Sequence, residues 1–477
     1  MTTGSHAGGP AAPGRLATLA GPRWLRVALA VLLAAAGLAL VTREVARQGG
    51  RVFDDPACVP ESPPGCWARS DIFPRLVGTR LAWHRESPYG QHTYDVLVSG
   101  YMPPETANPQ RFFYPLPLAV VLAPLAVLPY GVAGAAFTWI TTAVFLACMA
   151  LLMRAGSGGR IPWLVAVGLT GLIAAFSRLF GTAVVFQQPA LLIAALQAVA
   201  CVALVRGRWT LAGVFAGLSL VKPQFAIVSA LVVAAALLRH DRSRRGLLAM
   251  GGTLVVLLGV SFALVPAWVG QFLDEVRFYE QVNPTDSVLG LLGLSTPAIA
   301  ALTGVVAALL VGAVLALPRG GAAGLPLGSA YLGAIALALL VIPRIPLWIG
   351  PYDHQALLLG MALLGGALVA GRHRVAGVAV MATPVVAMLT WHFMGRWQGW
   401  VDALAGLFGH LDGLAIQPGM RYGGVVSDQL VQTVGVVVLL VACAWVAWAP
   451  EGLGEARARL GRLVAGLKAR RQPEGAS

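Results

Sequence analysis

Long runs of apolar residues, separated by short polar connections, dominate the chain from residue 23 almost to its end. A run of about 20 apolar residues has the length of a helix that crosses the hydrocarbon core of a bilayer. The pattern therefore predicts an all-α integral membrane protein, a multi-span helical bundle. Twelve spans are predicted, at 23–42, 131–153, 161–177, 189–205, 209–221, 224–238, 246–266, 298–317, 327–343, 355–371, 375–392 and 428–449.

The domain organisation follows from the same pattern. Residues 23–449 form one membrane domain, because no polar stretch within them is long enough for an independent soluble domain. Residues 1–22 and the basic residues 450–477 are predicted to be cytoplasmic tails. The large loop 43–113, after the first span, is the longest polar connection and is predicted to be extracytoplasmic.

Composition supports the membrane class: 57% of the residues are hydrophobic and only 11% are charged. The net charge of +14 comes almost entirely from arginines in short connections, as the positive-inside rule expects, so we predict no nucleic-acid partner. The protein is then a multi-pass protein of the cytoplasmic (inner) membrane. Its outer segments, which carry most of the acidic residues, are 43–113, 178–188, 267–290, 344–354 and 393–427.

This topology requires that the apolar stretch 114–129 does not cross the membrane. Its four prolines favour a segment that lies at the interface or re-enters. The cysteines Cys148, Cys201 and Cys443 fall within apolar runs and are interpreted as small core residues. Cys58 and Cys66 lie in the outer loop, where they either close a disulfide or remain free thiols.

Apolar and basic residues alternate at helical spacing over residues 71–83 of the outer loop. The pattern predicts an amphipathic helix that lies on the membrane surface, with Asp71 at its start. Asp71 could simply cap the helix. It could equally act as a base at the lipid–water boundary, where an acceptor hydroxyl must lose its proton.

Lys222 stands between two short apolar stretches and is followed by Pro223. A single span over 209–238 would place a cation and a helix-breaking proline in mid-membrane. A short hairpin with its turn at Lys222 removes this conflict and puts the arginines on either side of it in the same compartment. Lys222 then either binds a lipid phosphate or extends to the lipid headgroups.

Polar residues at the outer ends of two further spans are also candidates. Asp353 could cap the helix that follows it, and His354 could relay a proton or simply be interfacial. Gln187 and Gln188 could hold sugar hydroxyls or satisfy backbone groups at a helix end. The residues alone leave these alternatives open.

The chain has no P-loop, no G-x-G-x-x-G after a strand and no H-E-x-x-H. A transferase without a soluble nucleotide-binding domain must take an activated donor that is already in the membrane. This favours a polyprenyl-phosphate sugar over a nucleotide sugar.

The order of several short motifs resembles glycosyltransferase family 87 over roughly residues 65–370. The motifs are Asp71-Ile72-Phe73, Ser87-Pro88-Tyr89, Phe113-Tyr114-Pro115-Leu116-Pro117, Gln187-Gln188-Pro189 and Leu220-Val221-Lys222-Pro223. The resemblance implies a GT-C fold, with amphipathic helices in the first outer loop, and a polyprenyl-phosphate-sugar donor used outside the cytoplasmic membrane. This sequence departs from the family's usual Gly-Gln-x-Asn and from its double proline after the tyrosine, which leaves the sugar open.

By this resemblance, Asp71 and His354 are catalytic and Lys222 binds the donor phosphate, and Arg344 is a further candidate for binding that phosphate. The remaining candidates for substrate binding are Tyr114, Gln187, Gln188 and Asp353. We expect mannose as the sugar, a lipid or glycan acceptor, and inversion at the anomeric carbon in one displacement. No metal and no cofactor are expected. The alternatives are a lipid-linked sugar flippase or transporter and a membrane protein like an O-antigen ligase or polymerase.

Overall fold

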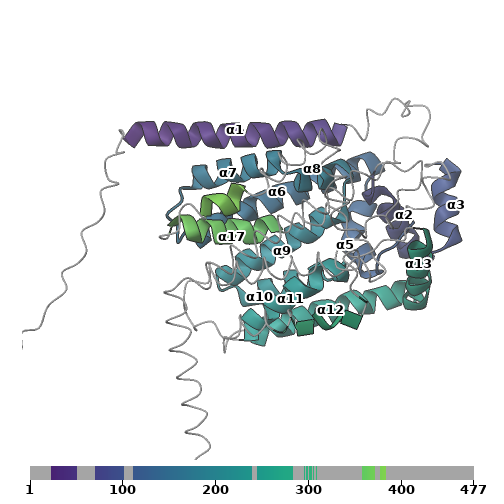
Figure 1. Cartoon of the computed structure of the whole chain (residues 1–477). Helices are drawn as coiled ribbons and strands as arrows, with labels where there is room; N and C mark the ends of the chain where they lie inside the picture. The colour runs from purple at the N-terminus through teal and green to yellow at the C-terminus, as the bar shows by residue number, and fades with distance from the viewer. Residues whose placement is uncertain are drawn as a thin grey trace, which may run out of the picture.

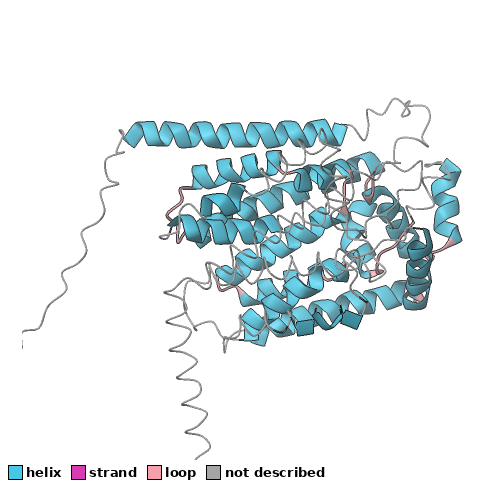
Figure 2. Ribbon diagram, in the orientation of Figure 1, coloured by secondary structure: helices cyan, strands magenta, loops and turns pink. Residues whose placement is uncertain are grey.

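The computed structural model describes residues 23–50, 70–100, 111–238, 244–282 and 357–370, together with parts of 295–308 and residues 377–382. Within these residues the regular structure is entirely helical (Figures 1 and 2). The helices are α1 (Arg23–Gly50), α2 (Ile72–Trp83), α3 (Gln91–Gly100), α5 (Pro117–Ala126), α6 (Tyr130–Gly156), α7 (Trp163–Phe176), α8 (Arg178–Val185), α9 (Pro189–Val205), α10 (Trp209–Ser219), α11 (Pro223–Leu238), α12 (Arg244–Leu264), α13 (Trp268–Val282) and α17 (Leu357–Ala370). The predicted all-α class is confirmed for the described part of the chain.

The apolar helices lie side by side as a bundle, and α2, α3 and α13 gather at one end of it (Figure 1). Glycines let neighbouring helices approach closely. A Cβ at Gly37 of α1 would collide with the backbone of α7 at Gly168, and a Cβ at Gly156 of α6 would collide with the backbone of α17 at Leu363. Small residues at helix contacts are typical of packing within membranes, where close backbone approach supplies the attraction.

Three described helices are long and apolar enough to cross a membrane: Leu25–Ala46, Tyr130–Gly156 and Arg244–Leu264. The outermost two expose large apolar side chains, such as Leu32 at 65% and Val255 at 70%. A surface of this kind belongs in lipid, and the protein is therefore a membrane protein. Shorter apolar helices occupy five other predicted positions, α7, α9, α10, α11 and α17. The total of twelve spans stays a prediction, because 327–343 and 428–449 lie outside the described residues.

The hairpin predicted around Lys222 is confirmed. Helix α10 ends at Ser219 and α11 begins at Pro223. A Cβ at Gly246, near the start of α12, would meet both the carbonyl of Trp209 at the start of α10 and the side chain of Leu237 at the end of α11. The two helices are therefore antiparallel. Arg206 and Arg208 consequently lie at the same end of the bundle as Arg244 and Arg245, as predicted.

The first-loop helix α2 differs from the prediction. Most of its residues are buried in protein, among them Arg75 at 7% exposure and Thr79 at 0%. It is therefore not an amphipathic helix on a membrane surface. Arg80 explains the difference, because its guanidinium donates to Ala126 O at 2.7 Å and to Leu128 O, so protein carbonyls replace water as its partners.

Two other expectations for this end of the molecule hold. Helix α3 is amphipathic, with Leu97 buried and Gln91, His92 and Asp95 exposed. Helix α5, within 114–129, has ten residues and is too short to cross the membrane, since ten residues of helix rise only about 15 Å.

Cysteine labelling tests the orientation of the bundle. In a variant whose five native cysteines are serine, His92→Cys is expected to react with an impermeant maleimide in intact cells, whereas Arg208→Cys reacts only after permeabilisation. Both positions are exposed, so a cysteine at either is accessible to the reagent. The opposite labelling pattern would contradict the predicted sides of the membrane.

Candidate functional site

Asp71 directly precedes α2 and is half-buried. Its backbone is already helical, with φ −73° and ψ −19°, and its side chain makes no capping hydrogen bond to α2. The backbone N–H of Asp71 instead donates to Phe186 O at 2.8 Å, which joins the start of α2 to the segment before α9. Asp71 therefore occupies the N-cap position of α2, as predicted, but its side chain does not cap the helix.

The side chain of Gln187 links the start of α2 to α6 through two hydrogen bonds. Its Oε1 accepts from the Ser70 hydroxyl at 2.6 Å, and its Nε2 donates to the Thr138 hydroxyl of α6 at 3.2 Å. Gln187 is 1% exposed and has φ +47°, a left-handed conformation that non-glycine residues rarely adopt. Strained backbone of this kind persists where the surroundings fix it and is frequent at functional sites. The amide of Gln187 thus fixes the position of Ser70, the residue before Asp71.

Gln188 is the residue before α9, which begins with Pro189. It is buried, at 2% exposure, and it makes no side-chain capping bond to the helix. Its amide therefore does not cap α9, and a role in holding a sugar hydroxyl stays a prediction.

Lys222 lies in the turn between α10 and α11 and is buried in protein, at 2% exposure. Its ammonium lies 5.8 Å from the centroid of the Tyr114 ring, so it does not extend to the lipid headgroups. Arg75 of α2 approaches the same ring, with Cζ 5.0 Å from the centroid. Two buried cations therefore converge on Tyr114, an arrangement that suits a phosphate.

A hydrogen bond also anchors the backbone of Tyr114. The Tyr89 hydroxyl donates to Tyr114 O at 2.8 Å. Burial and, secondarily, the Glu275 carboxylate raise the pKa of Tyr89 above its usual range, so the hydroxyl keeps its proton and remains a donor. The backbone of Tyr114 is therefore anchored next to the ring contacts with Arg75 of α2 and Lys222.

Sequence reasoning missed three residues here: Ser70, Arg75 and Thr138. Arg75 carried a usable signal, since it lies four residues after Asp71 and therefore on a neighbouring position of the same helical face. Ser70 and Thr138 had none, because their link through Gln187 joins parts of the chain that are distant in sequence. Arg344, Asp353 and His354, the other predicted site residues, lie outside the described residues.

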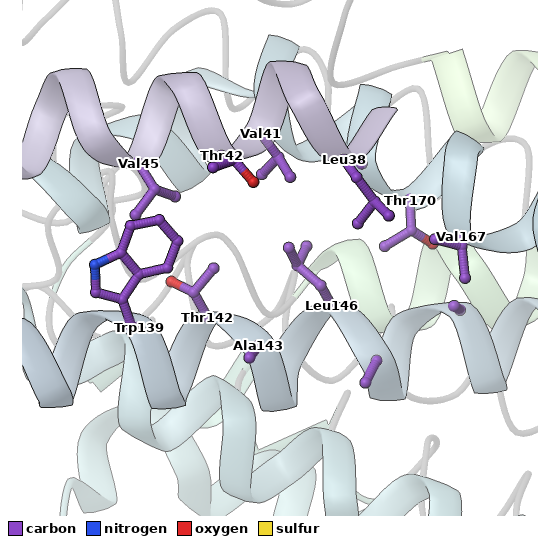
Figure 3. Close-up of a pocket in the computed structure, with 13 residues that line it drawn as sticks. Leu38, Val41, Thr42, Val45, Trp139, Thr142, Ala143, Leu146, Val167 and Thr170 are labelled. Carbon is purple, nitrogen blue, oxygen red and sulfur yellow. The ribbon is translucent and has the colours of Figure 1, made fainter. Parts of the chain in front are cut away.

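A groove of about 310 Å³ opens elsewhere in the bundle, between α1, α6 and α7 (Figure 3). Leu38, Val41, Leu146 and Val167 dominate its lining, with Trp139 at one end. Thr42, Thr142 and Thr170 are the polar residues of a lining that is otherwise apolar, and the groove has no charged side chain to bind a phosphate. Within the described residues, no group of three or more His, Cys, Asp or Glu side chains has the arrangement of a metal site.

The fold and these residues define an integral membrane protein with a carboxylate beside a buried, cation-rich region. The sequence model of glycosyltransferase family 87 matches residues 112–343, just under half of the chain. This match supports the predicted family: residues 112–343 are similar to glycosyltransferase family 87, which indicates a membrane glycosyltransferase. Comparisons with curated proteins and with solved structures returned no match. The matched region contains Tyr114, Gln187, Gln188 and Lys222, whereas Asp71 precedes it.

Proposed function

We propose that the protein transfers a sugar, mannose in the first instance, from a polyprenyl-phosphate donor to a lipid or glycan acceptor. The reaction takes place on the extracytoplasmic side of the cytoplasmic membrane. The observation that carries the proposal is the convergence of Lys222 and Arg75 on Tyr114, where Arg75 lies one helical turn after Asp71 in α2. A phosphate held inside a membrane domain indicates a donor whose carrier is a lipid.

Asp71 acts as the general base. Its carboxylate takes the proton of the acceptor hydroxyl as the hydroxyl oxygen forms a bond to the anomeric carbon. The bond from that carbon to the phosphate oxygen breaks, and its electron pair leaves with the polyprenyl phosphate. One displacement of this kind inverts the anomeric configuration.

Lys222 and Arg75 stabilise the leaving phosphate, whose negative charge increases as the bond breaks. Four residues of helix separate Asp71 from Arg75, a rise of about 6 Å along the axis. A base and a phosphate-binding cation on one helix can therefore act on opposite sides of a single sugar ring. Arg344 and His354 are proposed to complete the site from the predicted outer segment 344–354.

Incubation of membranes that contain the protein with radiolabelled polyprenyl-phosphate mannose, arabinose and glucose tests the proposal. Transfer of label from one lipid-linked donor, and not from the corresponding nucleotide sugar, is the expected result. Transfer from the nucleotide sugar in membranes depleted of polyprenyl phosphate would contradict the proposed donor class.

A further inference from the structure

Helix α13 binds the first-loop residues through a buried carboxylate. Glu275 is 4% exposed, and its Oε2 accepts the backbone N–H of Gly90 at 2.9 Å. Its Oε1 lies 3.7 Å from Nη1 of Arg111. One turn earlier on α13, Gln271 Oε1 accepts from the Ser87 hydroxyl at 2.9 Å. The helix is thus attached to both ends of the segment that leads to Tyr114.

Aromatic contacts add to the attachment. The Phe113 ring lies 6.4 Å from the Phe278 ring in a stacked geometry and 4.4 Å from the Tyr279 ring. The guanidinium carbon of Arg111 lies 4.2 Å from the centroid of Phe278. Residues 111–114, here called the strap, are therefore fixed to α13 by a charge pair and by ring packing.

The strap connects α13 to the candidate phosphate site. Its last residue is Tyr114, whose ring meets Arg75 and Lys222. A second route leads from Glu275 through Gly90 to its neighbour Tyr89, whose hydroxyl donates to Tyr114 O. Glu275 therefore acts on Tyr114 through two separate chains of contacts, although it lies outside the phosphate site itself.

We propose that Glu275 is a positioning residue that holds the Tyr114 wall of the donor phosphate site in place. This inference rests on the proposed function. Truncation of Glu275 would leave Arg111, which is 11% exposed, and the Gly90 N–H without this acceptor, so the strap would shift to find others. A shift of about 1 Å in a residue that positions substrate can cost as much as 100-fold in rate. Because the strap carries Tyr114 and not Asp71, the change should appear in donor affinity.

The test compares Glu275→Ala, Glu275→Gln and the control Asp274→Asn in the purified full-length protein. Asp274 is the adjacent carboxylate, is 75% exposed and pairs only locally with Arg277. We expect Glu275→Ala to raise the KM for the lipid-linked donor about tenfold, with kcat changed less than about threefold, since strap displacement of under 1 Å would suffice. Glu275→Gln keeps an acceptor for Gly90 and should raise the donor KM only about threefold or less. Asp274→Asn should match the wild type.

An unchanged donor KM in Glu275→Ala, with a lower melting temperature, would overturn the inference and leave Glu275 a purely structural residue. An equal KM increase in Asp274→Asn would overturn it as well. If Glu275→Ala is not produced, Arg111→Gln removes the other half of the pair, and an unchanged donor KM there has the same consequence. Absence of transfer by the wild type would reject the proposed function itself. An active wild type whose Glu275 variants have an unchanged donor KM would reject only the role of Glu275.

Discussion

Replacement of Asp71 by asparagine is expected to lower sugar transfer about 100-fold or more, the scale of a general base. Asparagine keeps the shape of the side chain but cannot take a proton from the acceptor hydroxyl. The backbone N–H bond from residue 71 to Phe186 O does not involve the side chain and should persist. The variant should therefore insert normally and bind the donor as the wild type does. Initial rates of transfer at saturating donor, on equal amounts of purified protein, provide the measurement.

Asp95→Asn is the matched control for this prediction. Asp95 belongs to the same predicted outer loop, is exposed on α3 and accepts a hydrogen bond from Gln91 at 2.8 Å. It should tolerate the change with full activity. Asp54 and Asp55 lie outside the described residues and should behave in the same way. An active Asp71→Asn together with an inactive Asp95→Asn would show that the catalytic carboxylate had been assigned to the wrong residue.

Lys222→Ala is expected to weaken donor binding about 10- to 100-fold, since a hydrogen bond to a charged group contributes about 1.5–3 kcal/mol. The ammonium is lost next to the Tyr114 ring, while Pro223 still ends the turn and begins α11. Lys222→Arg should recover part of the affinity, because a planar guanidinium keeps the charge but not the compact shape. Equilibrium binding of the lipid-linked donor, measured separately from turnover, distinguishes lost affinity from lost chemistry.

The second lysine, Lys468, gives a control in the same assay. It belongs to the predicted cytoplasmic tail, and Lys468→Ala should bind the donor normally. If Lys222→Ala also bound the donor with unchanged affinity, Lys222 would have no role in holding the phosphate, and its burial beside Tyr114 would be a matter of packing alone.

The helices were predictable from the sequence because their signals are local. The length of an apolar run such as 131–153 predicts the length of its helix. Lys222 and Pro223 would be unfavourable within one span, and this was enough to predict the α10–α11 hairpin. The arginines that flank the hairpin further predicted that its two ends face the same side of the membrane. None of these inferences required knowledge of what each helix packs against.

The environment of the candidate site was not predictable in this way. The alternation of apolar and basic residues in α2 is the same for a helix on a membrane and for one whose arginines find partners in protein. The outcome depended on Ala126, Leu128 and Tyr130, which Arg80 contacts from more than 45 residues away in the chain. The bond between Ser70 and Gln187 and the approach of Arg75 to Tyr114 are likewise contacts between distant segments.

The most direct measurement is the anomeric configuration of the product formed by purified protein in lipid nanodiscs from a lipid-phosphate sugar of known configuration. Transfer by one displacement, with Asp71 as base and the phosphate held by Lys222 and Arg75, predicts a product of the opposite configuration. NMR of the isolated glycolipid or glycan reads the configuration without reference to the variants. A product that retains the donor's configuration would contradict the single displacement. Product formed only from a nucleotide sugar would contradict the lipid-phosphate donor.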